Sequence, residues 1–427
     1  IFIYELICKS HSHEVCNAGF LKLYSEAFPN EKIFFYSNNS HIDCVKKELT
    51  NQISDKNVFF KKVSFSSDNG LINFIKKYFF IKKEKKKWVN NKVIFLSYNI
   101  IILKLLEFVL GNKNKFNLLL VSHGTFEFLG KNKLNPRDGF KNSISLYKRI
   151  KTKISQPRLL INLLIFNLKK IFNKFTSFPV SIFFKDFKSV LNSFDVPFVK
   201  FVLLSEHINL EIKKIENFKS LPRLVIPMPV IHKNFSINIP DNQINFGVIG
   251  YGMPDYQKKL LLKLESLKIT KAYSFRLIGM QPEIFKGFKN VKIPKPKNQI
   301  YLNRLEMENE IKKIHFQIIL YPEDSYRLSQ SLSVFEALRY QKPIIHIKNP
   351  CVSFYNRKNS EIGIECNDVD DMSLQIENLV DDLGKTRELY KKFIENINLL
   401  RNKYKIETLA KNLQHTYNTN KDYHEFF

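Results

Sequence analysis

Features that would mark a disulfide-rich, secreted or membrane-spanning protein are missing from this sequence. Its five cysteines are odd in number and scattered, and none forms a Cys-x-x-Cys pair, so we expect free thiols in a reducing cytoplasm. No apolar run reaches the roughly 18 residues that a membrane-spanning helix needs. The first residues, IFIYELIC, are typical of a strand and not of a basic leader with a cleavage site.

Acidic residues are also few, because 40 aspartates and glutamates stand against 68 lysines and arginines, giving a formal net charge of +28. Such an excess favours anionic partners, which include phosphorylated substrates, an anionic membrane surface and nucleic acid. No zinc pattern, recognition-helix signature or aromatic RNA-binding motif accompanies the charge, so nucleic acid is not expected. The length predicts two domains of about 180–230 residues each.

The most informative stretch runs from Tyr321 to Ile347 and reads YPEDSYRLSQSLSVFEALRYQKPIIHI. The apolar residues 316–320 predict a buried strand before it. The pattern then predicts a polar loop over residues 322–333, a helix over 334–340 and a second strand over 344–347. Strand, loop, helix and strand in this order are typical of an α/β protein with a parallel sheet.

Several side chains of this stretch could bind a nucleotide. Ser331 and Ser333 bring hydroxyls to the predicted helix N-terminus, where free N–H groups and the helix dipole favour an anion. Arg327 can hold phosphate with two hydrogen bonds, and Glu336 lies one turn into the helix, where it could accept bonds from sugar hydroxyls. A diphosphate and a ribose would satisfy all four side chains. A capped helix beside a solvated serine loop is the structural alternative.

The run SLSVFEAL, followed by QKPII, resembles the donor-site motif of bacterial glycosyltransferases with the GT-B fold. The resemblance implies that Glu336 holds the ribose of a nucleotide-sugar and that the serine loop holds its diphosphate. It also implies two Rossmann-like domains that face each other across a cleft, with a C-terminal helix returning to the first domain. Retaining members often carry a second glutamate eight residues earlier, but Leu328 stands there and Gln341 replaces the usual turn glycine, so a retaining mechanism is not implied.

A glycine pair marks the start of the predicted second domain. Residues 244–249 predict a strand, and Gly250 and Gly252 in the next loop allow the backbone to approach a phosphate that Lys258 could reach. The family places donor phosphate contacts at this loop too, and a simple strand-to-helix turn is the alternative. No metal or other cofactor is expected, since no acidic pair is placed as a diphosphate–metal clamp.

Polar residues also follow the first predicted strand, which covers residues 1–8. His11, His13 and Glu14 precede a helix predicted over residues 17–28, and open α/β sheets bind ligands at the carboxyl ends of their strands. These side chains could contact an acceptor sugar. A polar loop that caps the helix is the alternative, and a metal is not expected because no third ligand follows the His-x-His pair at a suitable spacing.

Another polar turn, SHGTFE, follows the strand predicted over residues 116–122. Gly124 permits close approach of the backbone, and His123 or Glu127 could act as the general base toward a hydroxyl nucleophile. The turn also resembles the His-Gly-x-x-Glu turn of some bacterial glycosyltransferases of this type. A strand-end histidine bonded to backbone and a surface carboxylate are the structural alternatives.

Two basic stretches stand out in the first predicted domain. One is FIKKYFFIKKEKKK over residues 74–87. The other lies within an insertion predicted over about residues 131–195, where apolar side chains between Arg158 and Lys174 form a wide stripe flanked by basic residues. This pattern is typical of a helix resting on an anionic membrane surface. An amphipathic helix packed on its own domain is the alternative.

The sequence therefore predicts a hexosyltransferase-type GT-B enzyme, cytoplasmic and peripheral on the inner face of the membrane. It would move sugar from a nucleotide-sugar to a glycan or lipid-linked acceptor in surface polysaccharide synthesis. The predicted parts are an acceptor domain over residues 1–226, a linker over 227–242, a donor domain over 243–404 and a helix over 405–427. A non-catalytic basic protein that binds membrane or nucleic acid, or a nucleotide-sugar epimerase on the same fold, is the alternative function.

Overall fold

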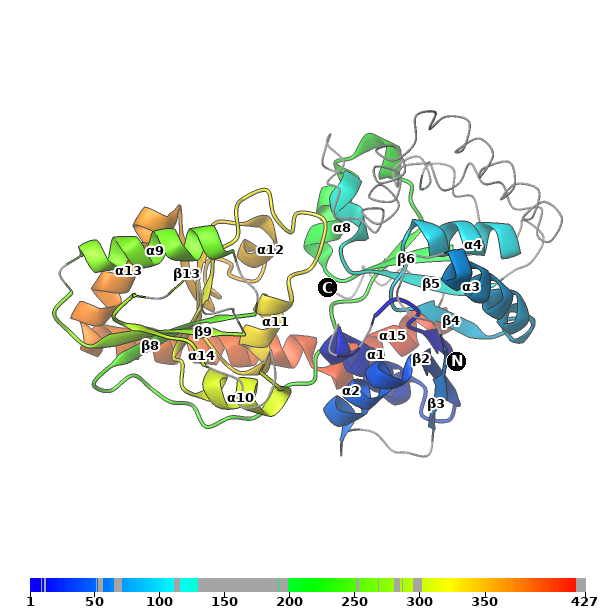
Figure 1. Ribbon diagram of the computed structural model, residues 1–427, viewed down its shortest axis with the longest axis horizontal. Coiled ribbons are helices and arrows are strands. Elements are labelled where there is room, and N and C mark those ends of the chain that lie inside the picture. Colours follow the sequence, from blue (N-terminus) through cyan, green and yellow to red (C-terminus); the bar gives the residue numbers. More distant parts are fainter. Residues whose placement is uncertain are drawn as a thin grey trace, which may run out of the picture. The chain divides into compact units, whose positions relative to one another are not determined.

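The computed structural model describes residues 1–8, 10, 13–50, 52, 57–64, 71–110, 116–129, 191, 199–250, 253–267, 269–279, 285, 287–294 and 302–419 (Figure 1). They form two α/β units. Unit 1 comprises Ile1–Asn17, Phe28–Leu203 and Ile215–Leu224, and unit 2 comprises Ala18–Ala27, Leu204–Lys214 and Val225–Phe427. The sequence did not indicate that residues 18–27 and 204–214 group with unit 2. The predicted limits of the domains and the linker stay predictions.

The first sheet belongs to unit 1, apart from its last residue, and has seven strands in the order β3-β2-β1-β4-β5-β6-β7. Neighbouring strands from β3 to β6 run parallel. The chain order reverses between β1 and β4, and open sheets of this kind bind ligands at such a switch point. The strands are β1 (Phe2–Tyr4), β2 (Ile33–Ser37), β3 (Val58–Lys62), β4 (Lys92–Phe95), β5 (Asn117–Ser122), β6 (Val199–Leu203) and β7 (Arg223–Val225).

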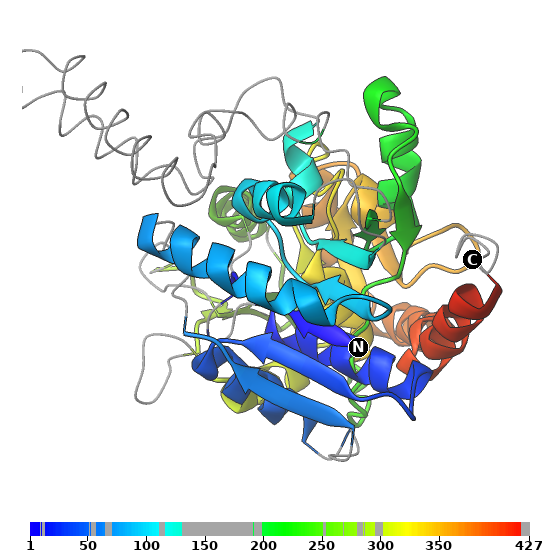
Figure 2. The same ribbon diagram turned by 90° about the vertical axis from the view of Figure 1, so that its right-hand side faces the viewer.

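Aromatic side chains fill the centre of this sheet. Tyr4 of β1 stacks on Tyr36 and Phe95 of the neighbouring strands, with ring centroids 4.9 and 5.0 Å apart. The fully buried Trp88 donates from its indole N–H to the Tyr4 hydroxyl at 2.8 Å, so the polar ends of both rings are satisfied. The unit carries α1 (Glu14–Ala27, in part), α2 (Asn39–Leu49), α3 (Leu71–Glu84) and α4 (Ile100–Leu110), of which α3 and α4 pack side by side (Figure 2).

The second sheet belongs to unit 2 and has six parallel strands in the order β10-β9-β8-β11-β12-β13. The switch point lies between β8 and β11. Helices α9 and α13 cover one face, and α10 and α14 cover the other (Figure 1). The strands are β8 (Ile244–Ile249), β9 (Tyr273–Ile278), β10 (Val291–Lys292), β11 (Phe316–Ile319), β12 (Ile344–Ile347) and β13 (Gly363–Cys366). The helices are α9 (Pro254–Ser266), α10 (Arg304–Lys312), α11 (Leu332–Arg339), α12 (Pro350–Ser353), α13 (Val369–Asp381), α14 (Leu383–Tyr404) and α15 (Ile406–Thr419).

The α/β class and the strands predicted for both sheets are confirmed, with shorter limits for several strands. Two helix starts were predicted too late, since α1 begins at Glu14 and α11 begins at Leu332. β13 was not predicted. His11, Gly252 and, except for Leu191, the predicted insertion lie outside the described residues. Within the described ranges, no helix is both long and apolar enough to cross a membrane, and no three His, Cys, Asp or Glu side chains are grouped to hold a metal ion.

Candidate active site

The loop between β11 and α11 is fixed by a hydroxyl network. The Tyr321 hydroxyl donates to Ser333 Oγ at 2.7 Å and lies 2.8 Å from Ser331 Oγ, which must then donate to it. Ser331 is also the N-cap of α11, because its Oγ accepts from the Ser333 N–H at 3.1 Å. Ser331 is therefore committed to holding the loop. Ser333 keeps its own hydroxyl proton, so of the two predicted serines it is the one able to donate to a phosphate.

Glu336 lies in the second turn of α11 and is 3% exposed. Its Oε1 accepts a hydrogen bond from Arg304 Nη1 at 3.2 Å. Its Oε2 is shielded from solvent and has no hydrogen-bond partner among the described residues. A buried oxygen left without a partner costs about 1–3 kcal/mol, and most buried polar side-chain atoms in proteins have one. A hydroxyl donor from a ligand would remove this cost.

Arg327 lies in the same loop, and its side chain is 53% exposed. Its Nε donates to Glu211 Oε2 of α8 (Glu206–Lys213) at 2.6 Å. The other oxygen of Glu211 pairs with Lys214. Partial burial raises the pKa of Glu211, but the hydrogen bonds from Lys214 and Arg327 outweigh burial and lower it, so Glu211 is ionised at neutral pH. The two terminal nitrogens of Arg327 have no partner in the described part of the chain.

His207 of α8 holds the backbone of this loop. Its Nε2 lies 3.3 Å from the Tyr326 carbonyl and 3.2 Å from the Ser329 carbonyl, so this nitrogen carries the proton. Its Nδ1 accepts from the Ser205 hydroxyl at 2.8 Å. Burial lowers the pKa of His207 to about 4, and the ring is neutral at pH 7. Tyr326 has a left-handed φ of 55°, which costs a residue with a Cβ about 1–2 kcal/mol.

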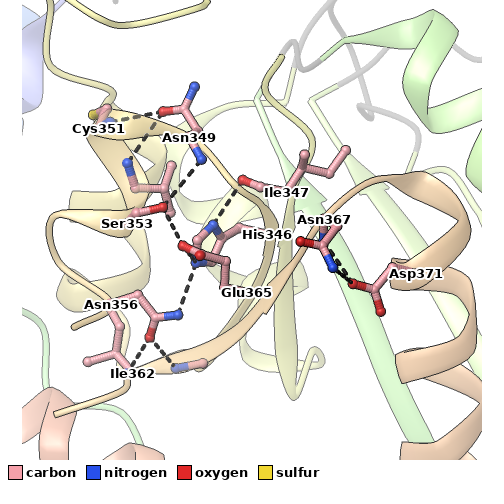
Figure 3. Close-up of polar contacts among 12 residues, drawn as sticks. His346, Ile347, Asn349, Cys351, Ser353, Asn356, Ile362, Glu365, Asn367 and Asp371 are labelled. Atoms are coloured by element: carbon pink, nitrogen blue, oxygen red, sulfur yellow. Dashed lines mark hydrogen bonds and ion pairs between the residues drawn. The ribbon is translucent and has the colours of Figure 1, made fainter. Parts of the chain in front are cut away.

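Asn349 connects the first part of the loop to α12. Its side-chain amide donates to the carbonyl oxygens of Pro322 and Ser325, both at 2.8 Å. Its oxygen accepts from the backbone N–H of Cys351 at 3.0 Å and so caps α12 (Figure 3). The loop is therefore fixed from two sides, by α12 near its beginning and by α8 near its end.

His346, the only charged or titratable side chain of β12, is structural. The residue is fully buried, and its Nδ1 donates to the Ile347 carbonyl at 3.0 Å. Its Nε2 accepts from the side-chain amide of Asn356 at 3.0 Å, as Figure 3 shows. Both ring nitrogens are thus occupied, and burial lowers the pKa of the ring. The histidine adjoins the donor-type motif in sequence but has no nitrogen left for a substrate.

Two glycines meet at the carboxyl ends of β8 and β9. Gly250 has φ +84° and Gly279 has φ +87°, a conformation that favours glycine. A Cβ added to Gly250 would meet nothing within 4 Å, so its backbone borders open space. Lys258, on the second turn of α9, is exposed and has no ion pair among the described residues. Because β8 and β11 are adjacent parallel strands, the Gly250 turn and the serine loop lie at the same edge of the sheet.

In unit 1 a buried carboxylate occupies the end of β1, a feature that sequence reasoning missed. Glu5 is 1% exposed, and its Oε1 accepts from the N–H groups of Ile7 and Cys8, each at 2.9 Å. Its Oε2 accepts from Ser97 Oγ at 2.6 Å and from the Asn17 amide at 3.3 Å. Four donors satisfy the charge, so Glu5 joins the loops after β1 and β4 at the switch point and is not available to a substrate.

The structure brings two predicted site residues of unit 1 together. The rings of His13 and His123 have centroids 4.5 Å apart. Both nitrogens of His123 are shielded from solvent and lack a hydrogen-bond partner of normal geometry in the described part of the chain. Burial and the neighbouring His13 hold the pKa of His123 well below its ordinary range, against a weaker opposite effect of the Leu96 backbone. A neutral but weakly basic imidazole results.

The two predicted carboxylates of unit 1 lie in different surroundings. Glu127 lies on a short 3-10 helix, Thr125–Leu129, and is partly exposed. Glu14 is 7% exposed and forms the first residue of α1, so it belongs to the helix start and not to an open loop as predicted. His13, which precedes it, is exposed and has a left-handed φ of 60°. Of these residues, His13 and Glu127 can be reached from solvent.

No protein-family model matches the sequence, and no curated protein sequence matches it. Solved structures do. A glycosyltransferase from Rickettsia africae ESF-5 is 13% identical with a TM-score of 0.57, covering 100% of this chain and 98% of that one. The lipopolysaccharide outer core galactosyltransferase WaaB is 12% identical with a TM-score of 0.53, and Anabaena HepE with UDP and glucose is 11% identical with a TM-score of 0.55. Each covers 98% of this chain and 99% of its own.

These likenesses extend over nearly the whole of every chain compared, so they concern both sheets and not one domain alone. They show that this protein has the fold of the bacterial GT-B glycosyltransferases, an α/β fold with two Rossmann-like domains. The fold expected from the SLSVFEAL motif is thereby confirmed.

Proposed function

We propose that this protein transfers a hexosyl group from a nucleotide-sugar to a hydroxyl of a glycan or lipid-linked acceptor in surface polysaccharide synthesis. The observation that carries the proposal is the unpaired, buried Oε2 of Glu336, one turn into the helix that Ser331 caps. A ribose hydroxyl is the kind of donor that this oxygen lacks. The solved structure of HepE contains UDP and glucose, which supports a nucleotide-sugar as donor for the same fold.

The cations of unit 2 fit the diphosphate of such a donor. Arg327 offers its two terminal nitrogens in the fork that matches a phosphate, and Ser333 offers a hydroxyl proton. Gly250 allows close backbone approach at the same sheet edge, and the exposed Lys258 supplies a further positive charge. During transfer, negative charge develops on the departing diphosphate, and fixed cations and donors stabilise it. We propose these groups for that role, with no metal required.

The acceptor hydroxyl needs a base in an inverting reaction. We propose Glu127 as that base, with His123 as the second candidate. Burial and the neighbouring His13 lower the pKa of His123 and so weaken this ring as a proton acceptor, and Glu127 is partly exposed to solvent. The exposed His13 beside His123 would contact the acceptor sugar, together with His11, which lies outside the described residues. Glu14, being nearly buried, would contribute only through the start of α1.

We also propose that the enzyme works at an anionic membrane surface. Part of unit 1 supports this, because α3 and the turn after it expose Phe79, 53% accessible, among the exposed lysines Lys76, Lys82, Lys83 and Lys86. Lysines around an exposed aromatic ring favour anionic headgroups. Anionic vesicles should retain the protein, and replacing Lys82 and Lys83 by Glu should weaken retention, as should salt, because salt screens the attraction. Equal retention on neutral vesicles would contradict this.

A thermal-shift screen against nucleoside diphosphates and nucleotide-sugars tests the donor site. We expect at least one to raise the melting temperature in the wild type and in Glu388→Ala, a control at an exposed α14 carboxylate, but to do so less in Glu336→Ala. No shift with any of these compounds would overturn the proposed function. Consumption of a nucleotide-sugar without any acceptor would instead favour an epimerase.

A further inference from the structure

Helix α8 contacts the loop between β11 and α11 through three separate groups. Glu211 bonds Arg327 Nε at 2.6 Å. His207 bonds the loop backbone at the carbonyls of Tyr326 and Ser329. The third connection runs from Ser205, the N-cap of α8, to the Tyr355 hydroxyl at 2.9 Å, which also lies 3.0 Å from Gln330 Oε1. Consecutive turns of one helix therefore hold both the backbone and the side chain of the Arg327 segment.

The contact with Glu211 uses the Nε of Arg327 and leaves its two terminal nitrogens free of Glu211. The carboxylate of Glu211 accepts from the Nε of Arg327 alone, and this charge-assisted bond restricts the orientations of the guanidinium. An exposed arginine otherwise loses considerable rotamer freedom when it binds a ligand, so fixing it in advance strengthens binding. The remaining nitrogens stay available to an oxyanion.

The charges around Glu211 also favour an anion. One carboxylate is shared by two cations, because Lys214 pairs with Oε1 and Arg327 with Oε2. The three groups together keep a net positive charge beside the loop. A carboxylate that paired with Arg327 alone would cancel its charge and weaken its attraction for a diphosphate. Because Glu211 also pairs with Lys214, a net positive charge remains.

We propose that Glu211 is a positioning residue for nucleotide-sugar binding, which orients the Arg327 guanidinium toward the donor diphosphate while His207 holds the backbone beneath it. The inference rests on the proposed function, since it takes Arg327 to be a diphosphate ligand. It assigns a donor-site role to α8, a helix far from the SLSVFEAL motif in the sequence.

A double-mutant cycle with Glu211→Ala and Arg327→Ala tests the proposal. The readouts are Kd for the nucleoside diphosphate found in the screen, by calorimetry, and KM and kcat for the matching nucleotide-sugar. We expect each single variant to weaken binding by about fivefold to thirtyfold. In the Arg327→Ala background, Glu211→Ala should cause no further loss, because Glu211 acts only through Arg327. KM for the donor should rise more than kcat falls.

Further variants separate positioning from folding. Glu211→Gln keeps an oxygen for Arg327 Nε and should retain most of the affinity, whereas Glu211→Asp is too short to reach and should resemble Glu211→Ala. The control Glu216→Ala removes an exposed carboxylate that forms an ion pair with Lys219 and should leave Kd unchanged. Additive losses in the double mutant, or equal losses with Gln and Ala, would overturn the positioning role. An unchanged Kd in Arg327→Ala would instead refute the proposed diphosphate contact.

Discussion

Replacement of Glu336 is the perturbation whose effect can best be worked out from the structure. Glu336→Ala removes the carboxylate that we propose accepts a hydrogen bond from a ribose hydroxyl. A hydrogen bond to a charged group contributes about 1.5–3 kcal/mol, so Kd for the nucleotide should rise roughly 10-fold to 150-fold. Glu336→Gln keeps the side-chain volume and one acceptor oxygen, and its loss should be smaller.

The fold should survive these substitutions. The contact of Glu336 with Arg304 is lost, but Arg304 is 21% exposed and can turn to water, and the cost of the unpaired Oε2 disappears as well. Isothermal titration calorimetry with the nucleotide found by thermal shift gives Kd directly, and circular dichroism confirms folding. The exposed α14 variant Glu388→Ala is the matched control and should bind like wild type. A folded Glu336→Ala protein with unchanged Kd would refute the role of this carboxylate.

Three further predictions concern catalysis, pH and backbone. Glu127→Gln should lower turnover by about 10²–10⁴ with donor Kd unchanged, and His123→Ala should lower it less; near wild-type turnover in both would place the base elsewhere. The folded pKa of His207, about 4, lies below its ordinary value of 6.5, so the unfolded chain binds the proton more readily and stability should fall as pH drops from 7 toward 4. Urea midpoints at pH 7 and pH 5 should differ less in His207→Asn than in wild type; an equal difference would exclude His207 as a main contributor. Gly250→Ala should cost about 1–2 kcal/mol of unfolding free energy through its left-handed φ, although the added methyl meets no atom, and an unchanged urea midpoint would show that the turn relaxes.

Sequence patterns predicted the parts of this fold that depend on local chemistry. Buried parallel strands are short apolar runs between polar loops, and residues 244–249 and 316–319 are strands where such runs occur. β13 was not predicted because its four residues, GIEC, include a glycine and a glutamate and so do not form an apolar run. Helix starts were less accurate, since a buried carboxylate such as Glu14 looks in sequence like a loop residue.

The candidate donor site was predicted only in part, for a physical reason. Ser331, Ser333, Arg327 and Glu336 are close in sequence, and the rules for helix termini identify them. Their partners Glu211 and Arg304 come from other segments, and no local pattern connects a residue to a contact that tertiary packing makes. Tyr321 stands at the end of a predicted buried strand, which is a weak indication of a structural role. Only the structure shows that its hydroxyl is hydrogen-bonded to Ser331 Oγ.

The most direct test of glycosyl transfer is release of nucleoside diphosphate from a nucleotide-sugar by purified protein, measured with and without a glycan or lipid-linked acceptor mixture and paired with mass spectrometry of the acceptor. We predict release that depends on the acceptor, an acceptor mass increased by one hexose residue, and rates of both that fall by about 10²–10⁴ in Glu127→Gln. Absence of release with every nucleotide-sugar and acceptor, or conversion of the nucleotide-sugar without any change in acceptor mass, would contradict the proposed function.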